Sequence, residues 1–353
     1  MARIGCGTHT AVIIDRDTGH TTVQFDRPIR TEWSRVRDTN STARVQVPTA
    51  GCCEQLASVR PWRHELVIYR DGVQVWQGPV TQPVSWSDVA TIVADDPWSW
   101  LDVRYPREDV EISGDLTSIA QRLIAIGLTH PDGVPDETGV LDHVQVRPAG
   151  VWGEREFEAY RSSVGASLRS LCGGGMHATF VGRRLVLAGQ QPLGRLPAVL
   201  QDQDFVGGVS VTYDGYAAAS RVIVLGADGV TAAYGRTDPY YGLIERVISD
   251  STITDHGSAL ELARIEAGAG MPPPAVVSLG DNAILAEGAP VSIEQLVPGV
   301  VVPIWTTETC FTADSDMILD RVRVVEDEQG ETVAITVSEH SAWTGEMISG
   351  TAP

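Results

Sequence analysis

The 353-residue sequence contains no lysine, because all 26 of its basic residues are arginines. They face 46 acidic residues, so the formal net charge is −20. Such an acidic chain is poorly suited to bind nucleic acid through phosphate contacts, which need clustered basic side chains. Residues 201–353 hold 23 acids and 6 arginines (net −17), against 23 acids and 20 arginines (net −3) in residues 1–200. This asymmetry indicates either that the two parts face different neighbours or that the second part has a solvated acidic face.

Cysteine is also scarce, and no two cysteines have C-x-x-C spacing. The five cysteines are Cys6, Cys52, Cys53, Cys172 and Cys310. An odd number without paired spacing argues against a disulfide framework and a structural zinc site, and it fits a reducing compartment. No apolar run approaches the roughly 20 residues of a membrane-spanning helix, and the N-terminus lacks the apolar stretch of a signal peptide. We therefore expect a soluble chain without a membrane anchor.

Standard catalytic motifs are missing. The sequence has no G-x-S-x-G elbow, no H-E-x-x-H, no Walker loop and no G-x-G-x-x-G after a strand. Cys172 and His177 are close in sequence, but Cys172 falls on the apolar face of a predicted helix, which favours a buried, inert thiol. A glycosidase needs only two suitably separated carboxylates, yet nothing marks a particular pair among the acids. We expect no enzymatic activity and no cofactor.

Two segments contain possible metal ligands. The first holds His130, Asp132, Asp136, Glu137, Asp142 and His143, but its spacing matches no standard site and a polar loop explains it equally well. The second, residues 15–19, resembles the start of a calcium-binding loop, but the glutamate expected near its twelfth position is missing. A polar loop and a hairpin turn are therefore expected, without a metal.

Residues 1–106 are predicted to be β-rich. Short runs of β-branched and aromatic residues predict strands at 21–25, 44–47, 65–69 and 91–94. Asp71 and Gly72 favour a tight turn into a return strand that contains Trp76 and ends at Gly78 and Pro79.

Residues 107–200 change to an α/β pattern. Asp115 can cap a helix that ends near Gly127, and Ser162 or Ser163 can cap a second helix that ends at the glycines 173–175. A short hairpin is expected across Gly182.

Residues 201–345 return to β structure, and residues 346–353 form a tail. Strands are predicted at 209–213, 221–225, 243–248, 300–305, 318–325 and 332–338, the last two joined as a hairpin across 326–331. One helix is predicted from Asp255 to Ala267, stopped by the Gly and Pro residues that follow. No short repeat is visible, but the order predicts a mainly β chain with an α/β unit inserted between two similar β-rich units.

Most of the tryptophans lie in or beside predicted strands. This placement favours packing in a core or a subunit interface over a carbohydrate platform. The nine are Trp33, Trp62, Trp76, Trp86, Trp98, Trp100, Trp152, Trp305 and Trp343.

An ordered set of motifs runs through most of the chain, with residues 131–161 the least matched. It comprises WSRV (33–36), ARVQVP (43–48), Cys52 or Cys53, HELVIYRDG (64–72), VWQGPV (75–80), DDPWSWL (95–101), YGLIE (241–245), STITD (251–255) and LVPG (296–299). In this order the motifs resemble the minor tail proteins of actinobacterial siphophages.

The resemblance implies a tail-tip baseplate hub of the virion, synthesised in the bacterial cytoplasm. It implies two barrel domains related to the tail tube protein, one on each side of the α/β domain, with residues 255–267 as a barrel helix. It also implies a ring of three chains, in which six similar modules adapt the sixfold tube to a threefold tip. Residues with structural roles in this interpretation are Trp33, Asp71, Gly72, Trp76, Gly78, Pro79, Trp98, Trp100, Asp255, Pro298 and Gly299.

Implied partners are further copies of the chain, the distal tail or tail tube protein, the tape measure protein and other minor tail proteins. Genomic DNA would pass through without specific binding. Two alternatives stay open, a hexameric distal tail protein and a carbohydrate- or receptor-binding tail module.

The charge asymmetry adds one expectation to this interpretation. An acidic channel wall repels phosphates and keeps DNA mobile. The candidates for lining or rimming such a channel are Asp202, Asp204, Glu326, Asp327 and Glu328. The alternative is that these acids form a solvated outer face.

Overall fold

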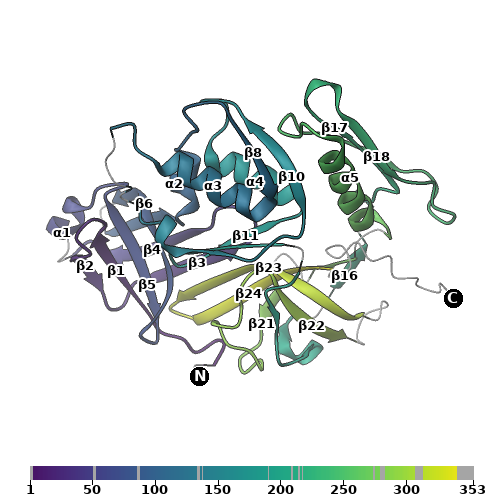
Figure 1. The fold of residues 1–353 in the computed structure, drawn as a ribbon. Helices are drawn as coiled ribbons and strands as arrows, with labels where there is room; N and C mark the ends of the chain where they lie inside the picture. The colour runs from purple at the N-terminus through teal and green to yellow at the C-terminus, as the bar shows by residue number, and fades with distance from the viewer. Residues whose placement is uncertain are drawn as a thin grey trace.

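The computed structural model describes most of the chain. The described residues are 3–50, 53–85, 88–132, 136, 138–189, 191–207, 210–213, 215–216, 218–272, 275–278, 283–306 and 313–339. Among the residues discussed above, Cys52, Trp86, Glu137, Val209, Cys310, Trp343 and the predicted tail lie outside them. The described chain is mainly β, with an α/β unit between two β-rich parts (Figure 1), which confirms the predicted fold class.

Seven strands and one short helix form the first β half. They are β1 (His9–Asp15), β2 (Thr21–Phe25), β3 (Arg30–Val36), β4 (Thr42–Pro48), α1 (Cys53–Ser58), β5 (His64–Arg70), β6 (Val73–Ser85) and β7 (Val89–Asp95). In β4 and β7 every second residue is buried, because one face of the sheet packs on the core. Asp71 and Gly72 both have positive φ, at 50° and 80°, and turn the chain from β5 into β6.

The predicted end of β6 at Gly78 and Pro79 is wrong, because the strand continues to Ser85. Pro79 pairs with Glu65 in the last rung of the ladder with β5, and from Val80 onward the strand pairs with β7. A proline is tolerated at this position because the ladder on that side ends there.

The inserted unit combines four helical segments with short strands. It contains α2 (Trp98–Asp102), β8 (Val110–Asp115), α3 (Leu116–Leu128), η1 (Leu141–His143), β9 (Val144–Val146), β10 (Trp152–Phe157), α4 (Val164–Gly173), β11 (His177–Val181) and β12 (Arg184–Ala188). The Asp115 side chain accepts a hydrogen bond from the Thr117 amide at the start of α3, and Ser163 caps α4 in the same way. Both predicted helices and the hairpin across Gly182 are confirmed. Trp98 and Trp100 belong to the hydrophobic core of this unit, together with α3 and α4.

The second β half has more, and shorter, elements. They are β13 (Gly194–Arg195), β14 (Leu200–Gln201), η2 (Asp202–Asp204), β15 (Phe205–Val206), β16 (Ser210–Tyr213), β20 (Ala275–Ser278), β21 (Ala283–Leu285), β22 (Val300–Thr306), β23 (Ala313–Asp327) and β24 (Gly330–Glu339). The predicted hairpin of the last two strands is confirmed, but its turn is tighter than expected, because Glu326 and Glu331 still pair in the ladder.

A separate small unit lies between β16 and β20. It contains β17 (Arg221–Leu225), η3 (Ala227–Gly229), β18 (Thr231–Gly235), β19 (Glu245–Ser249) and α5 (His256–Gly270), which packs on the sheet of β17 and β18 around its own core. The predicted helix is confirmed at its start, where Asp255 caps it, but it continues through Gly268 to Gly270. The helix therefore belongs to this unit (Figure 1), and the expectation that it is the helix of a second barrel is wrong.

The two β halves share one 14-stranded sheet and one hydrophobic core. They meet where β3 of the first half pairs with β23 of the second, from Thr31 opposite Glu326 to Val36 opposite Arg321. The core includes Trp33 and Trp76 from the first half and Met317 and Ile335 from the second. The two halves therefore pack as one body, although about 100 residues separate them in sequence.

The two halves also repeat the same topology. The order β3-β4-β7-β6-β5 in the first half matches β15-β21-β24-β23-β22 in the second, and every neighbouring pair is antiparallel. A bulge interrupts both central hairpins just after the equivalent residues Val80 and Leu319. The carbonyls of these two residues accept equivalent amide hydrogen bonds, from Trp62 and Gly299. The chain is therefore an internal duplication, and residues 207–282 are an insertion where the first half has only the connection between β3 and β4.

Candidate functional site

The junction between the two halves contains three ion pairs on its exposed side. Arg30 with Asp327 (3.1 Å), Glu32 with Arg323 (2.7 Å) and Arg37 with Asp320 (2.8 Å) each join one half to the other. All six side chains are partly exposed, so each pair contributes modestly to stability. Their alternation along the paired strands fixes the register of β3 on β23.

Arg35 belongs to the buried side of β3 and is only 4% exposed. Its guanidinium donates hydrogen bonds to the carbonyl oxygens of Ile293 (3.0 Å), Leu296 (3.1 Å) and Val75 (2.9 Å). It also lies 5.0 Å from the ring centroid of Trp33. Burial lowers the pKa of Arg35 to about 10, so the side chain remains charged at neutral pH. One buried cation thus connects the β3 strand with carbonyls of both halves.

A second buried group joins the N-terminal segment and β5 to the start of β24. Arg70 donates from Nε to Glu331 Oε1 (2.6 Å) and from Nη2 to Oε2 (2.7 Å), and the backbone amides of Gly5 and Gly7 also donate to Oε2. Both charged side chains are almost fully buried. Burial alone would raise the pKa of Glu331, but the Arg70 ion pair and the Gly7 amide more than offset this, so the pKa is lowered.

His9 is the third buried polar group of the junction. The Trp33 indole N–H donates to His9 Nε2 (3.1 Å), and His9 Nδ1 lies 3.0 Å from Glu326 Oε2. Because an indole can only donate, Nε2 must be the acceptor and the proton must be on Nδ1. Burial lowers the pKa of His9, which agrees with a neutral ring.

The five acids suggested for a channel wall lie in two places. Asp202 and Asp204 belong to η2, where Asp204 accepts a hydrogen bond from the Gln201 amide (2.8 Å). The other three lie at the β23–β24 turn, where Glu326 contacts His9, Asp327 pairs with Arg30 and Glu328 is exposed. Of the three acids at the turn, Asp327 therefore makes an ion pair within the chain, and Glu326 accepts a hydrogen bond from the neutral His9 ring.

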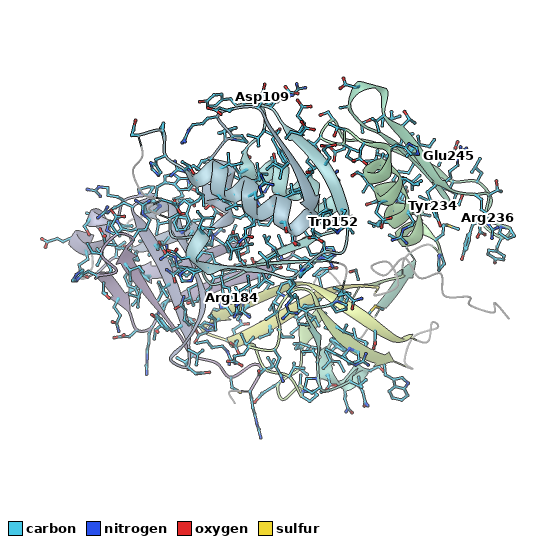
Figure 2. All side chains as sticks on the ribbon, in the orientation of Figure 1. Asp109, Trp152, Arg184, Tyr234, Arg236 and Glu245 are labelled. Carbon is cyan, nitrogen blue, oxygen red and sulfur yellow. The ribbon has the colours of Figure 1, made fainter. Side chains whose placement is uncertain are left out.

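The tryptophans divide into a buried and an exposed group. Trp33, Trp76, Trp98 and Trp100 are at most 3% exposed, whereas Trp62, Trp152 and Trp305 are 39%, 73% and 40% exposed. Figure 2 shows Trp152 at the start of β10. Most of the buried aromatic area therefore serves the two large cores.

Three of the predicted structural glycines and prolines lie where the backbone is crowded or turned. A Cβ at Gly78 would collide with the carbonyl oxygen of Asp95 on the neighbouring strand. Gly299 has φ +98° and donates its amide to the Leu319 carbonyl (2.7 Å), and Pro298 precedes it at the entrance to β22.

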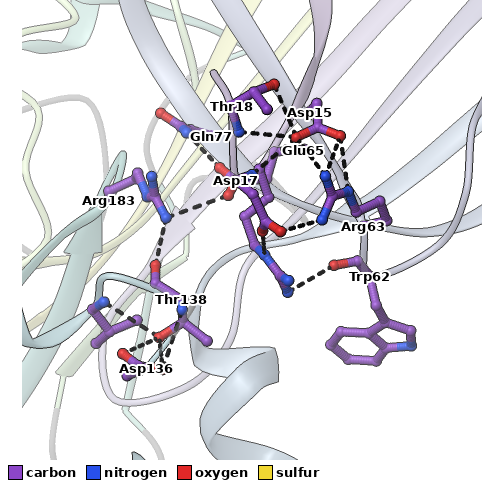
Figure 3. Close-up of polar contacts among 12 residues, drawn as sticks. Asp15, Asp17, Thr18, Trp62, Arg63, Glu65, Gln77, Asp136, Thr138 and Arg183 are labelled. Carbon is purple, nitrogen blue, oxygen red and sulfur yellow. Dashed lines mark hydrogen bonds and ion pairs between the residues drawn. The ribbon is translucent and has the colours of Figure 1, made fainter. Parts of the chain in front are cut away.

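A cluster of polar contacts connects the first half with the inserted unit (Figure 3). Arg183 lies 3.3 Å from the buried Glu65 and also donates to the Thr138 carbonyl. Beside it, Asp15 accepts from the Thr18 amide and from Arg63, and these hydrogen bonds lower the pKa of Asp15 to about 2. Residues 15–19 are thus a hairpin turn with ion pairs.

Cys172 and His177, the residues considered for thiol chemistry, both lie beside Asp38. Cys172 is buried, which raises the pKa of its thiol well above the ordinary value. His177 Nδ1 lies 2.9 Å from Asp38 Oδ2, a contact that joins β11 to the segment after β3. Within the part of the chain that the structure describes, no group of three or more His, Cys, Asp or Glu side chains could hold a metal ion. In the same residues, no helix combines the length and the apolar character needed to span a bilayer.

An open cleft lies between α4 and the small unit. Its lining is mostly serine, threonine and small apolar residues, and only Asp250 and Glu266 can carry charge. Asp250 accepts from Ser170 and Thr252, and Glu266 pairs with Arg246. Asp250 therefore lies beside two hydroxyl groups, and the described lining residues include no histidine or cysteine that could serve as a base or a thiol nucleophile.

Comparison with known proteins gives matches only at the level of structure. No protein-family profile and no curated protein sequence matches this chain. The 43 kDa tail protein of prophage MuSo2 from Shewanella oneidensis is similar over 95% of this chain and 99% of its own, with a TM-score of 0.64 at 13% identity. A tail protein from Neisseria meningitidis is similar over 96% and 98%, with a TM-score of 0.66 at 12% identity.

The chain shares its fold with phage tail proteins. A third similar structure is the c3393 protein of E. coli, described as a type VI secretion component with structural similarity to the T4 tail proteins gp27 and gp5. It covers 88% of this chain and 73% of its own, with a TM-score of 0.51 at 12% identity. The likeness extends over nearly the whole length, so the order of two β halves with an inserted α/β unit is a property of this fold.

Proposed function

We propose that the chain is a non-enzymatic structural protein of a phage tail tip that forms a trimeric hub ring around the DNA channel. The duplicated strand order of the two β halves carries this proposal, because three chains then supply six equivalent modules. Six modules on a threefold axis match a sixfold tail tube on one side and a threefold tip on the other. The fold shared with tail proteins and with c3393 supports the same role.

The partners in this proposal are further copies of the chain, the distal tail or tube protein above the ring, the tape measure protein and other minor tail proteins. DNA passes through without specific binding. Asp327 is paired with Arg30, and the partly buried Glu326 accepts a hydrogen bond from His9. The proposed acidic wall is therefore tested at the other three acids, Asp202, Asp204 and Glu328. Substituting these three by asparagine or glutamine should slow DNA ejection, and an unchanged ejection rate would remove them from the channel wall.

Immunogold labelling of tailed particles with antibodies against this chain tests the proposal. Gold is expected at the tail tip only, and threefold averaging of that region should give density for three chains. Label on the capsid or along the tail tube, or six chains in one ring, would contradict it. Six chains would instead support a hexameric distal tail protein.

A further inference from the structure

Among the described residues, each half has one strand edge without a partner strand, the distal edge of β6 in the first half and the outer edge of β15 and β16 in the second. In the second half, β23 extends beyond β22, and the edge of residues 321–326 is covered by β3 of the first half. The equivalent strand of the first half, β6, extends beyond β5 in the same way after Pro79. Within the described chain, no strand covers this distal edge of β6, which pairs only with β7 on its other side.

The complementary edge lies in the second half. β15 is the second-half equivalent of β3. It pairs with β21, where Val206 lies opposite Ile284, as β3 pairs with β4, where Arg30 lies opposite Gln46. β16 follows along the chain and pairs with β20, which lies against β24. The outer edge of β3 binds β23, whereas no strand of the described chain pairs with the outer edge of β15 and β16.

We propose that β16 of one copy pairs antiparallel with the distal part of β6 in the next copy, and thereby repeats the β3–β23 contact between chains. This inference rests on the proposed ring, for which it names the contact surface. Figure 1 shows β6 and β16 on opposite sides of the molecule. Two different complementary edges on opposite sides produce a head-to-tail contact, which gives a ring when the rotation between neighbouring chains closes and does not give a twofold dimer.

The register follows from the equivalence. In the junction within the chain, Val36 is paired with Arg321, which lies two positions after Leu319 at the bulge. Val80 is the equivalent of Leu319, so Gln82 is the equivalent of Arg321. Sequence numbering from Val206, the counterpart of Arg30, gives Thr212 as the counterpart of Val36, and residues 208–209 between them lie outside the described residues. The predicted rung therefore joins Gln82 of one chain with Thr212 of the next.

The geometry of that rung suits a disulfide. The Arg37 amide donates to the Asp320 carbonyl (3.0 Å), so the neighbouring rung of Val36 and Arg321 is a non-hydrogen-bonded pair. Cα atoms in such pairs are roughly 4.5 Å apart, which lies within the range that a disulfide spans.

Cysteine cross-linking of the full chain tests the proposal. The variant carrying Gln82→Cys and Thr212→Cys should form covalent dimers and trimers on oxidation and nothing larger, whereas each single variant should give no ladder above the native-cysteine background. A mixture of the two single variants should stop at dimers. The variant with Val36→Cys and Arg321→Cys is the matched control, since its disulfide must form within one chain.

A second variant tests the edge without cysteines. Val211 corresponds to Arg35, whose amide faces β23, so Val211→Pro removes an amide on the outer edge only. Its oligomer should dissociate to monomers by light scattering, and its melting temperature should match that of the unsubstituted chain diluted to its monomeric state.

The outcomes separate the inference from the proposed function. A trimer that resists Val211→Pro and does not cross-link at 82 and 212, although the control disulfide closes, overturns the edge contact and leaves the hub proposal standing. Absence of any covalent oligomer at high protein concentration, with the control closed, also overturns the contact. A ladder that continues to six chains supports the contact and contradicts the ring of three.

Discussion

Glu331→Gln tests whether the two β halves are held together by buried charge. Glu331 and Arg70 are 0% and 2% exposed at their side chains, and the substitution leaves the buried Arg70 guanidinium with only the partly exposed Asp71, 3.4 Å away, as an ion-pair partner. Removing one partner of such a pair costs about 3 to 5 kcal/mol. Both carboxylate oxygens of Glu331 accept hydrogen bonds. In glutamine an NH2 group replaces one of these oxygens, and because NH2 cannot accept, at least one donor loses its hydrogen bond.

Urea unfolding measures the loss of stability, and amide hydrogen exchange on the same variant shows which strands open more readily. The free energy of unfolding should fall by about 3 to 5 kcal/mol. Amides of β5 and the N-terminal segment should exchange faster, although the substitution lies in β24. Glu328→Gln, on the exposed turn three residues earlier, is the matched control and should change stability by less than about 0.5 kcal/mol.

Two further comparisons test the contribution of the Arg70–Glu331 pair. A Glu331→Gln variant as stable as the Glu328→Gln control would show that this pair does not hold the halves together. Replacing both partners, as Arg70→Met with Glu331→Met, should recover much of the loss, because no buried charge then remains unpaired.

The lowered pKa of Glu331 also predicts how the stability of the chain changes with pH. Its contribution is present above the ordinary pKa of glutamate and is lost on acidification, because the unfolded chain then binds the proton first.

Three further predictions concern the first half. Trp76→Ala removes an indole that is 2% exposed and should cost about 3 to 5 kcal/mol in urea unfolding, and a smaller loss than 1 kcal/mol would place the ring outside the core. Gly72→Val forces a β-branched residue to a φ of 80° and should lower stability by about 1 to 3 kcal/mol, so an unchanged melting temperature would contradict the turn geometry. His9 should make the chain less stable as the pH falls below the ordinary pKa of histidine, because the unfolded state takes up a proton that the folded state resists. His9→Gln should flatten that dependence, and an unaltered pH profile would argue against the buried neutral ring.

Local features of the fold can be predicted from the sequence because they depend on few neighbouring residues. Asp115, Ser163 and Asp255 cap helices at the predicted positions, and each accepts a hydrogen bond from an amide two or three residues later. The sequence does not predict strand β18, since TAAYG has little β-branched content and the strand is defined by its pairing with β17.

Features that depend on residues far apart in the sequence cannot be predicted from local sequence patterns. β6 continues past Gly78 and Pro79 because β7 takes over the pairing from β5, and nothing near the proline announces that exchange. Arg70 and Glu331 are 261 positions apart, and each by itself reads as an ordinary surface charge at the end of a strand. Arg35 gives a weak signal, as a charged residue beside a tryptophan in a strand that is otherwise buried on that face.

The duplication also explains why β6 contains a proline at position 83. By equivalence with Val322, which is paired with Arg35, the backbone of Pro83 faces the open edge of the strand. A proline there removes one amide donor and limits indiscriminate pairing of an exposed edge before assembly. The carbonyls of the same edge stay available as acceptors for the amides of an incoming strand. A contact with β16 would thus have one hydrogen bond fewer than β3–β23. We therefore expect the contact between chains to be weaker than the junction within a chain, so that each chain folds as one body before the ring closes.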